Sequence, residues 1–388
     1  MLYRTNCSSE DYSAYISTLT ACGYTYHDGR TAGNVTSSTY YSDSEILNVS
    51  FTPTDNTLRV CADPRTEAAL QPLTATPYNG RTDIEPLFIQ VGDTLSSASR
   101  GMSYVIRLCD GTFVVVDGGG SQNASVAMGL INILKDYNKL KGVPVVSCWI
   151  FTSGDYYHNS AFINSIHNDH RDKIDLKSVL FSFPSEEQAK KQATSESNAR
   201  FLQSGFRQRV NNFHDGTVFY KARTGQVLHF AGCEIEVLFT FEDHAQPKDL
   251  AYFNDAPIVF RLSLSDGTTT QSVLMLGDSH EDVAKILEQR YGNYLRSDAI
   301  QIAQRGSKGG TEAFYDAVGA GVVFWACKTS NFTKTNWATA TRDMLGKSYA
   351  KVLYAACKGN SAVNLTQIKN RSIIADHAPC MNAADRPI

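Results

Sequence analysis

The sequence predicts an α+β protein in which a small α+β domain precedes a large four-layer αββα sandwich, with two sheets packed face to face between outer helices. Two observations predict this class. From residue 86 onward, short apolar runs bounded by turn signals lead into segments with helical spacing, the β-then-α order expected of such a sandwich. The chain also has 388 residues, of which 42% are hydrophobic, so it can bury a large core.

The first domain is predicted to span residues 1–72. A helix is expected from Ser9 to Ala21, and Gly23 is expected to end it, because Ser and Gly are favoured at those positions. Residues 73–85 are rich in turn formers and are predicted to be a linker. No motif in this domain indicates a role. Its expected strands, which show alternation, are Thr36–Tyr41, Glu45–Thr52 and Thr57–Ala62.

The second domain is predicted to span residues 86–372, followed by a tail at 373–388. A polar segment with helical spacing at 185–211 is expected to be an insertion that covers the site as a lid. The expected elements are Leu87–Gln90, a hairpin from Tyr104 to Val116, the helix Ala124–Asn138, the strand Val145–Phe151, strand pairs within Gln226–Phe241 and Ala256–Leu276, the helix Asp282–Tyr291, a strand at Ile300, the helix Ala313–Val318 and the strand Val322–Cys327.

Four polar motifs end strand-like runs in this domain. The predicted hairpin ends in Asp117-Gly118-Gly119-Gly120, and the strand at 145–151 runs into Thr152-Ser153-Gly154-Asp155-Tyr156-Tyr157-His158. Two later strands end in Gly277-Asp278 and in Gln304-Arg305-Gly306-Ser307.

Together these four motifs resemble the metallo-β-lactamase superfamily, most closely its competence-protein branch, the hydrolase domain attached to bacterial DNA-uptake channels. The resemblance runs from about Pro86 to Gly359. In that branch a strand ends in Thr-His-x-His-x-Asp-His, a Gly-Asp supplies a bridging carboxylate, and a His-His-Gly-Ser loop closes the site. The resemblance implies a metallo-β-lactamase-like sandwich in a bacterial protein, and it implies that Asp117 is a structural aspartate that anchors the metal loop.

Most of the branch's metal ligands are replaced. The resemblance places its first histidine at Ser153, its second at Asp155 and its aspartate at Tyr157, and only the third histidine is kept, as His158. Asp278 matches the Gly-Asp carboxylate. Gln304 and Arg305 stand where the His-His pair is expected, before the expected Gly306 and Ser307.

A catalytic zinc site uses about three protein ligands and a water. The motifs offer Asp155, His158 and Asp278, whereas Ser153 and Tyr157 are poor ligands because their hydroxyls stay protonated at neutral pH.

Three interpretations stay open. In the first, Asp155, His158 and Asp278 are catalytic residues that hold one zinc or manganese ion, aided by His280, and a bound water hydrolyses a phosphoester or similar bond. In the second, which we favour, the metal is gone, and Asp155 and Asp278 pair with Arg305 or with backbone groups. In the third, Arg305, Lys308 and the glycine-rich loop bind an anionic ligand.

The favoured interpretation predicts a pseudoenzyme, non-catalytic or weakly active, that binds an unknown protein or a small anionic ligand. Its ligand-binding residues are expected to be Ser153, Tyr157, Gln304, Arg305 and Ser307. The formal net charge of −3 argues against nucleic acid as a partner.

The absence of an apolar run near 20 residues and of a signal-peptide pattern predicts a soluble, cytoplasmic protein. The nine cysteines form no C-x-x-C pair and are expected to be reduced. Histidines outside the motifs are expected to be structural or solvated, namely His167, His170, His214, His229 and His244.

Overall fold

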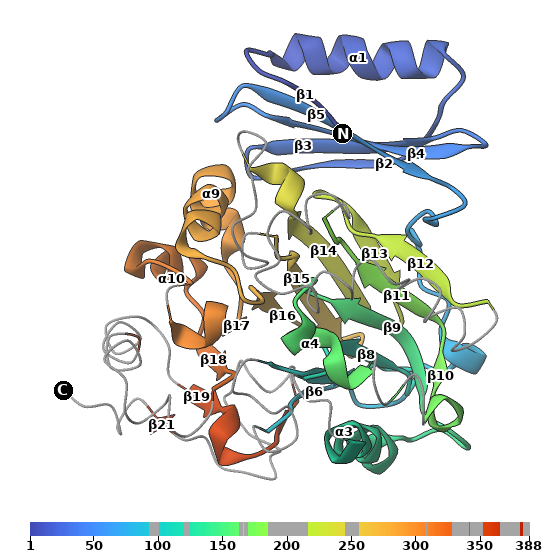
Figure 1. The fold of residues 1–388 in the computed structure, drawn as a ribbon, viewed down its shortest axis with the longest axis vertical. Coiled ribbons are helices and arrows are strands. Elements are labelled where there is room, and N and C mark those ends of the chain that lie inside the picture. The colour runs from blue at the N-terminus through green and yellow to red at the C-terminus, as the bar shows by residue number, and fades with distance from the viewer. Residues whose placement is uncertain are drawn as a thin grey trace.

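The computed structural model describes residues 1–92, 101–119, 124–162, 166, 170–184, 216–244, 256–307, 309–327, 341, 352–364 and 381–382. The predicted lid at 185–211 therefore lies outside the described residues. Within them, a five-stranded N-terminal sheet carrying one helix is followed by two larger sheets with helices on their outer sides (Figure 1).

The N-terminal sheet is antiparallel, with the strand order β1-β5-β4-β3-β2. The helix α1 (Ser9–Ala21) has the predicted bounds and begins at a capping box in which Ser8 and Asp11 each accept a hydrogen bond from the other's backbone N–H. An apolar cluster that includes Tyr12 and Val49 joins this helix to the sheet. The strands are β1 (Leu2–Arg4), β2 (Thr25–Ala32), β3 (Val35–Tyr41), β4 (Glu45–Thr52) and β5 (Thr57–Pro64).

The first large sheet has the order β12-β11-β9-β8-β7-β6-β20, with β10 paired to β9. Its parallel strands are β8, β9, β10, β11 and β12. Its strands are β6 (Leu87–Gln90), β7 (Tyr104–Arg107), β8 (Phe113–Val116), β9 (Val145–Phe151), β10 (Asp175–Leu176), β11 (Ser178–Phe181), β12 (Val218–Lys221) and β20 (Ser361–Val363).

The second large sheet has the order β13-β14-β15-β16-β17-β18-β19-β21, and β16 to β19 are parallel. Its strands are β13 (Val227–Phe230), β14 (Cys233–Phe239), β15 (Val259–Ser265), β16 (Thr270–Met275), β17 (Ala299–Gln301), β18 (Val322–Trp325), β19 (Val352–Ala355) and β21 (Met381–Asn382). The last of these lies in the segment predicted to be a tail and pairs with β19.

Helices cover both outer sides, which makes the four layers. The helices α3 (Ala124–Tyr137) and α4 (Tyr156–Ala161) lie on the first sheet, and α9 (Glu281–Tyr291) and α10 (Glu312–Val318) lie on the second (Figure 1). Short 3₁₀ turns complete the described elements: η1 (Tyr78–Gly80), η3 (Arg171–Lys173), η4 (Phe241–Asp243), η6 (Gly292–Leu295), η7 (Ala303–Gly306) and η8 (Ala356–Lys358).

Three apolar layers hold the sandwich together. The middle layer lies between the two sheets, where Phe88 and Ile150 of the first sheet and Phe260 and Phe324 of the second belong to one buried cluster. The outer layers lie beneath α3 and beneath α9 with α10. Burial of apolar residues on both faces of each sheet explains why the run 145–151 is apolar except at Ser147 rather than alternating.

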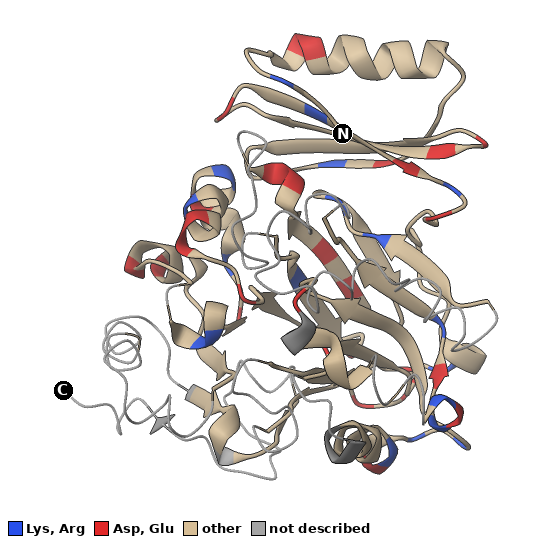
Figure 2. Ribbon diagram, in the orientation of Figure 1, with Lys and Arg blue, Asp and Glu red and all other residues tan. Residues whose placement is uncertain are grey.

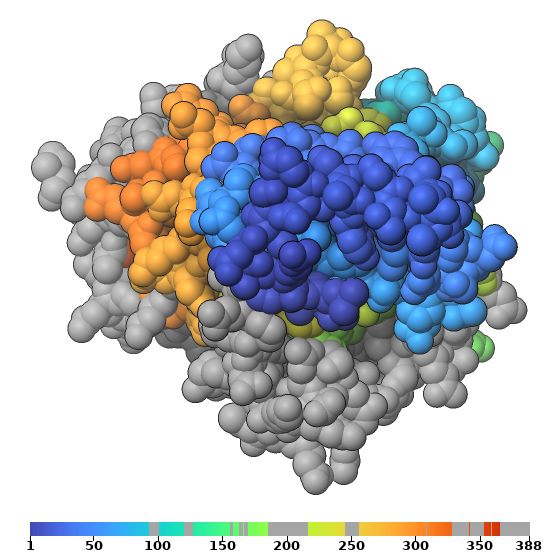
Figure 3. All heavy atoms as spheres, turned by 90° about the horizontal axis from the view of Figure 1, so that it is seen from above, coloured from blue at the N-terminus to red at the C-terminus, as the bar shows by residue number. Residues whose placement is uncertain are grey.

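Buried ion pairs fix the N-terminal unit to the end of the sandwich. Arg223 makes a bidentate contact with Asp63 of β5, with Nε–Oδ2 and Nη2–Oδ1 distances of 2.8 and 2.6 Å, and its Nη1 also contacts Glu242. Arg290 of α9 contacts Asp55 at 2.7 Å. Viewed from above, the N-terminal residues cover this end of the molecule (Figure 3).

Lys and Arg residues and Asp and Glu residues are interspersed along the described elements (Figure 2). A surface that binds nucleic acid is normally basic. That nucleic acid is not a partner stays a prediction drawn from the net charge.

Candidate functional site

The predicted motifs meet at one edge of the sandwich, beyond the carboxyl ends of β8, β9, β16 and β17. The motifs at 152–158 and 277–278 approach each other closely at Gly277, whose φ is 59°. A Cβ on this residue would lie only 3.3 Å from the Thr152 side chain, so the absence of a side chain permits the approach. The backbone N–H of Ile258 also donates to the Thr152 carbonyl at 2.7 Å, which joins the two sheets at this point. Such an edge, where strands of an α/β sheet end, is a common place for a ligand site.

Asp117 anchors the loop after β9. This residue is fully buried and has a φ of 54°, a left-handed conformation that Asp adopts more readily than most residues. Its Oδ1 accepts the backbone N–H of Thr152 at 2.8 Å, and its Oδ2 accepts the Thr152 hydroxyl at 2.7 Å. The contacts are those expected of the structural aspartate that the resemblance implies.

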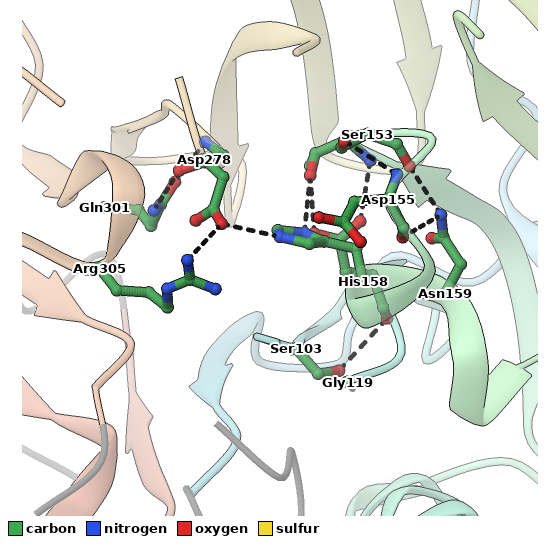
Figure 4. A network of polar contacts seen from close by, with 12 residues as sticks. Ser103, Gly119, Ser153, Asp155, His158, Asn159, Asp278, Gln301 and Arg305 are labelled. Carbon is green, nitrogen blue, oxygen red and sulfur yellow. Dashed lines mark hydrogen bonds and ion pairs between the residues drawn. The ribbon is translucent and has the colours of Figure 1, made fainter. Parts of the chain in front are cut away.

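His158 lies between two carboxylates (Figure 4). Its Nδ1 is 2.7 Å from Oδ2 of Asp117, and its Nε2 is 3.2 Å from Oδ2 of Asp278. The first contact is a hydrogen bond, and the second is a close ion pair without good hydrogen-bond alignment. Arg305 reaches the same Oδ2 of Asp278 with its Nη2, at 3.0 Å. We call Asp117, His158, Asp278 and Arg305 the charge array.

The charge array is balanced when the imidazole of His158 is protonated. Burial lowers the pKa of His158, but the charges of Asp117 and Asp278 outweigh that effect and raise the pKa from 6.5 to about 10. Burial raises the pKa of Asp278, yet Arg305 and His158 bring it below its ordinary value. At neutral pH two negative and two positive groups therefore neutralise one another.

The loop that carries Arg305 is held in an uncommon backbone conformation. Gln304 and Arg305 both have positive φ values, 45° and 53°, and the indole N–H of Trp325 donates to the Arg305 carbonyl at 2.7 Å. Gly306 lies against the same indole, since a Cβ there would be 2.5 Å from the ring. The loop is therefore positioned from beneath by the end of β18.

The other predicted residues take different places. The Ser153 hydroxyl accepts the backbone N–H of Asp155 at 3.1 Å, and the Asp155 carbonyl accepts the backbone N–H of His158 at 3.0 Å. Asp155 thus contributes to the start of α4 through its backbone. The Ser307 hydroxyl donates to the side chain of Gln304 at 3.2 Å.

Tyr157 lies within α4, and His280 is the residue that precedes α9. His244 is buried and stacks edge-on against Phe239, and His229 pairs with Glu234. The described residues do not include four others named in the sequence analysis, Lys308, Gly120, His167 and His214.

Sequence reasoning missed two residues that shape the site. Gln301 accepts the backbone N–H groups of Leu276 and Gly277 at 2.8 and 2.7 Å, and so fixes the strand end that carries Asp278. Trp325 supports the Arg305 loop, as described above. The sequence does contain an indication of the role of Gln301. An amide within the apolar run Ile300-Gln301-Ile302 is expected to be buried and therefore to need hydrogen-bond partners.

The donors of the charge array fit a metal ion only in part. His158 keeps the carboxylate contact on its second nitrogen that orients metal-binding histidines. The 3.2 Å gap between Nε2 and the Asp278 oxygen is also one that two ligands, each about 2 Å from one zinc ion, can have.

Two features oppose metal binding. Arg305 contacts the oxygen of Asp278 that a cation would need. Within the described ranges, no three His, Cys, Asp or Glu residues gather in a metal-binding group. The described residues therefore do not fit a zinc site with three protein ligands.

No protein-family model and no curated protein matches this chain. Solved structures resemble it at low identity. YhfI from Bacillus subtilis, a metallo-β-lactamase fold protein, is 14% identical with a TM-score of 0.42 over 71% of this chain and 98% of its own. CmlA, a diiron β-hydroxylase from Streptomyces venezuelae, is 13% identical with a TM-score of 0.43 over 72% of this chain and 54% of its own. A metallo-β-lactamase from Cronobacter sakazakii is 12% identical with a TM-score of 0.30 over 74% of this chain and 82% of its own.

The order of sheets and helices makes the described part of this chain after the N-terminal sheet a four-layer αββα sandwich, the fold class that the sequence predicts. The small N-terminal sheet with its helix precedes that fold. Among the helices that the structure describes, none combines the length and apolarity needed to cross a bilayer.

Proposed function

We propose that this chain is a degenerate metallo-β-lactamase-fold protein that binds a ligand at the old site without metal-dependent hydrolysis. The observation that supports this proposal is the contact of Arg305 with Asp278 at 3.0 Å, on the oxygen that also faces His158. A cation bound at that oxygen would have to displace the guanidinium. The array is neutral without a metal, so the carboxylates have no uncompensated charge that a cation would relieve.

The ligand we propose is a small anion. Arg305 is the most exposed member of the charge array, with an 18% exposed side chain against 6% for Asp278 and none for His158. A molecule that enters from solvent therefore meets the guanidinium before it meets the carboxylate of Asp278. Guanidinium groups bind carboxylates and phosphates through paired N–H donors.

Metal content is the first test. Protein purified without chelators is assayed for zinc, manganese and iron, together with Asp278→Ala and Arg305→His. We expect well under one metal per chain in the wild type and in Asp278→Ala, and an increase in Arg305→His, which restores a ligand and removes a positive charge. Arg296→His serves as the matched control, because Arg296 is exposed and outside the array.

Anion binding is the second test. Thermal unfolding is followed with inorganic phosphate and with a small dicarboxylate, in the wild type, Arg305→Ala and Arg296→Ala. We expect the anions to raise the melting temperature of the wild type and of Arg296→Ala, and to have little effect on Arg305→Ala. Equal responses from all three proteins would remove the proposed anion site.

The alternative function is a mononuclear metal-dependent hydrolase, which the spacing of His158 and Asp278 favours. It predicts close to one metal per chain, lost in Asp278→Ala, and hydrolysis of bis(p-nitrophenyl) phosphate that depends on the metal. That pair of results would overturn the binding proposal.

A further inference from the structure

Two thiols lie in contact at the site edge of the second sheet. The Sγ atoms of Cys327 and Cys357 are 3.9 Å apart. Cys327 is fully buried, and Cys357 is partly exposed. They are separated by 30 positions in the chain, so their contact comes from the fold rather than from a local motif.

The strand register brings the two cysteines together. The parallel strands β18 and β19 pair Trp325 with Ala355, and each cysteine lies two residues beyond its strand's member of that pair. Cys327 follows the end of β18, and Cys357 lies in η8, the turn that begins where β19 ends. Because the cysteines lie past the last residues that the ladder pairs, a bond between them would leave the ladder intact.

The pair belongs to the edge that carries the charge array. Cys327 follows Trp325, the residue whose indole holds the Arg305 carbonyl. The buried Tyr104 hydroxyl provides a second indication of proximity. Its pKa is raised by burial and then by Asp117, Cys327 and Asp278, so the thiol and both carboxylates act on one hydroxyl.

We infer that Cys327 and Cys357 form a reversible disulfide that ties the ends of β18 and β19 beside the charge array. The oxidant is a low-molecular-weight disulfide such as oxidised glutathione. The accessible Cys357 thiolate attacks one sulfur of the oxidant, which forms a mixed disulfide and releases one thiolate. The Cys327 thiolate then attacks Sγ of Cys357 and releases the second. The two cysteines lose two electrons and two protons, and the oxidant becomes two thiols.

The test uses the full chain, reduced and then incubated with oxidised glutathione. Remaining thiols are alkylated, and the protein is digested and analysed by mass spectrometry. We expect a peptide pair linked through Cys327 and Cys357 that dithiothreitol separates. In Cys327→Ser we expect a glutathione adduct that persists on Cys357, because the resolving thiol is gone. Cys22→Ser is the matched control, since Cys22 is exposed and its loss should leave the linked pair unchanged.

Two outcomes would overturn the inference. In the first, both cysteines of the wild type are still alkylated at every ratio of oxidised to reduced glutathione. In the second, wild-type Cys357 keeps its adduct as stably as the variant does, which would mean that Cys327 cannot reach it. If Cys327→Ser fails to fold, the wild-type peptide map decides alone. As an independent readout, we expect oxidation to raise the urea concentration at the unfolding midpoint, and dithiothreitol to reverse that rise.

Discussion

Replacing His158 with glutamine removes the titrating member of the charge array and leaves a side chain that can still form hydrogen bonds. In the folded protein the pKa of His158 is about 10, against 6.5 for an ordinary histidine. The pKa is higher in the folded state, so the associated stability is fully present below pH 6.5. It is lost as the pH rises toward 10.

The size of this effect follows from the interval between the two pKa values. Each pH unit within it changes the unfolding free energy by about 1.4 kcal/mol per proton, so the whole interval corresponds to about 5 kcal/mol. At low pH the protein loses stability through a different group, Asp278. The pKa of Asp278 is lowered in the folded state, so its stabilisation is present above its unfolded pKa and is lost as the pH falls through the folded one.

The assay is urea unfolding at pH steps from 7 to 9, in the wild type, His158→Gln and His229→Gln. We expect the wild type and His229→Gln to lose more stability per pH unit than His158→Gln, by about 1.4 kcal/mol. Thiols and other groups that titrate in this range contribute equally to all three proteins and cancel. Parallel pH dependences in all three would refute the proposal that His158 is an imidazolium at neutral pH. Should His158→Gln not fold, an NMR titration of the wild-type imidazole decides the same question.

Three further predictions concern stability, each measured by urea unfolding. Asp117→Asn should cost about 3 to 5 kcal/mol, because the amide keeps the size of the side chain but removes the closer of the two carboxylates that face the buried imidazolium of His158. Gly306→Ala should cost about 2 kcal/mol or more through its φ of 80° and its clash with Trp325, whereas Gly267→Ala, at φ of 89° in open space, should cost only about 1 kcal/mol. Arg223→Ala should cost about 3 to 5 kcal/mol, because it removes the guanidinium that pairs with the buried Glu242 and leaves Asp63 only the 3.5 Å contact with Lys221. An equal cost from an exposed arginine would contradict that reasoning.

Fully buried strands were the easiest elements to predict. The strands β6 and β9 have the predicted bounds, because burial on both faces favours a run that is apolar at nearly every position, here with Gln90 and Ser147 as the exceptions. The edge strand β2, which is mostly exposed or half-buried, was missed, because no alternation marks it. The short strands β10 and β20 were also missed, since each owes its conformation to a partner far away in the chain.

The site could also be predicted only in part, because some of its contacts depend on residues that are far apart in the chain. Asp117, His158 and Asp278 were named because each ends a strand in a recognisable motif. Which of the two acidic side chains would meet the histidine depended on the approach of Gly277 to Thr152, which only the packed sheets determine. The inward position of Arg305 likewise depends on two residues with positive φ, a conformation that the sequence does not reveal for Gln or Arg.

The ion pairs beneath the N-terminal sheet bear on how this chain should be divided, in the laboratory and in evolution. Arg223 and Arg290 each share their charge between one carboxylate of the N-terminal unit and one of the sandwich. Cutting the chain near residue 72 would leave both arginines short of one partner. We therefore expect the sandwich to be less stable when it is produced alone. A homologue that lacks the first domain would need each arginine only for its pair within the sandwich, with Glu242 or with Asp243.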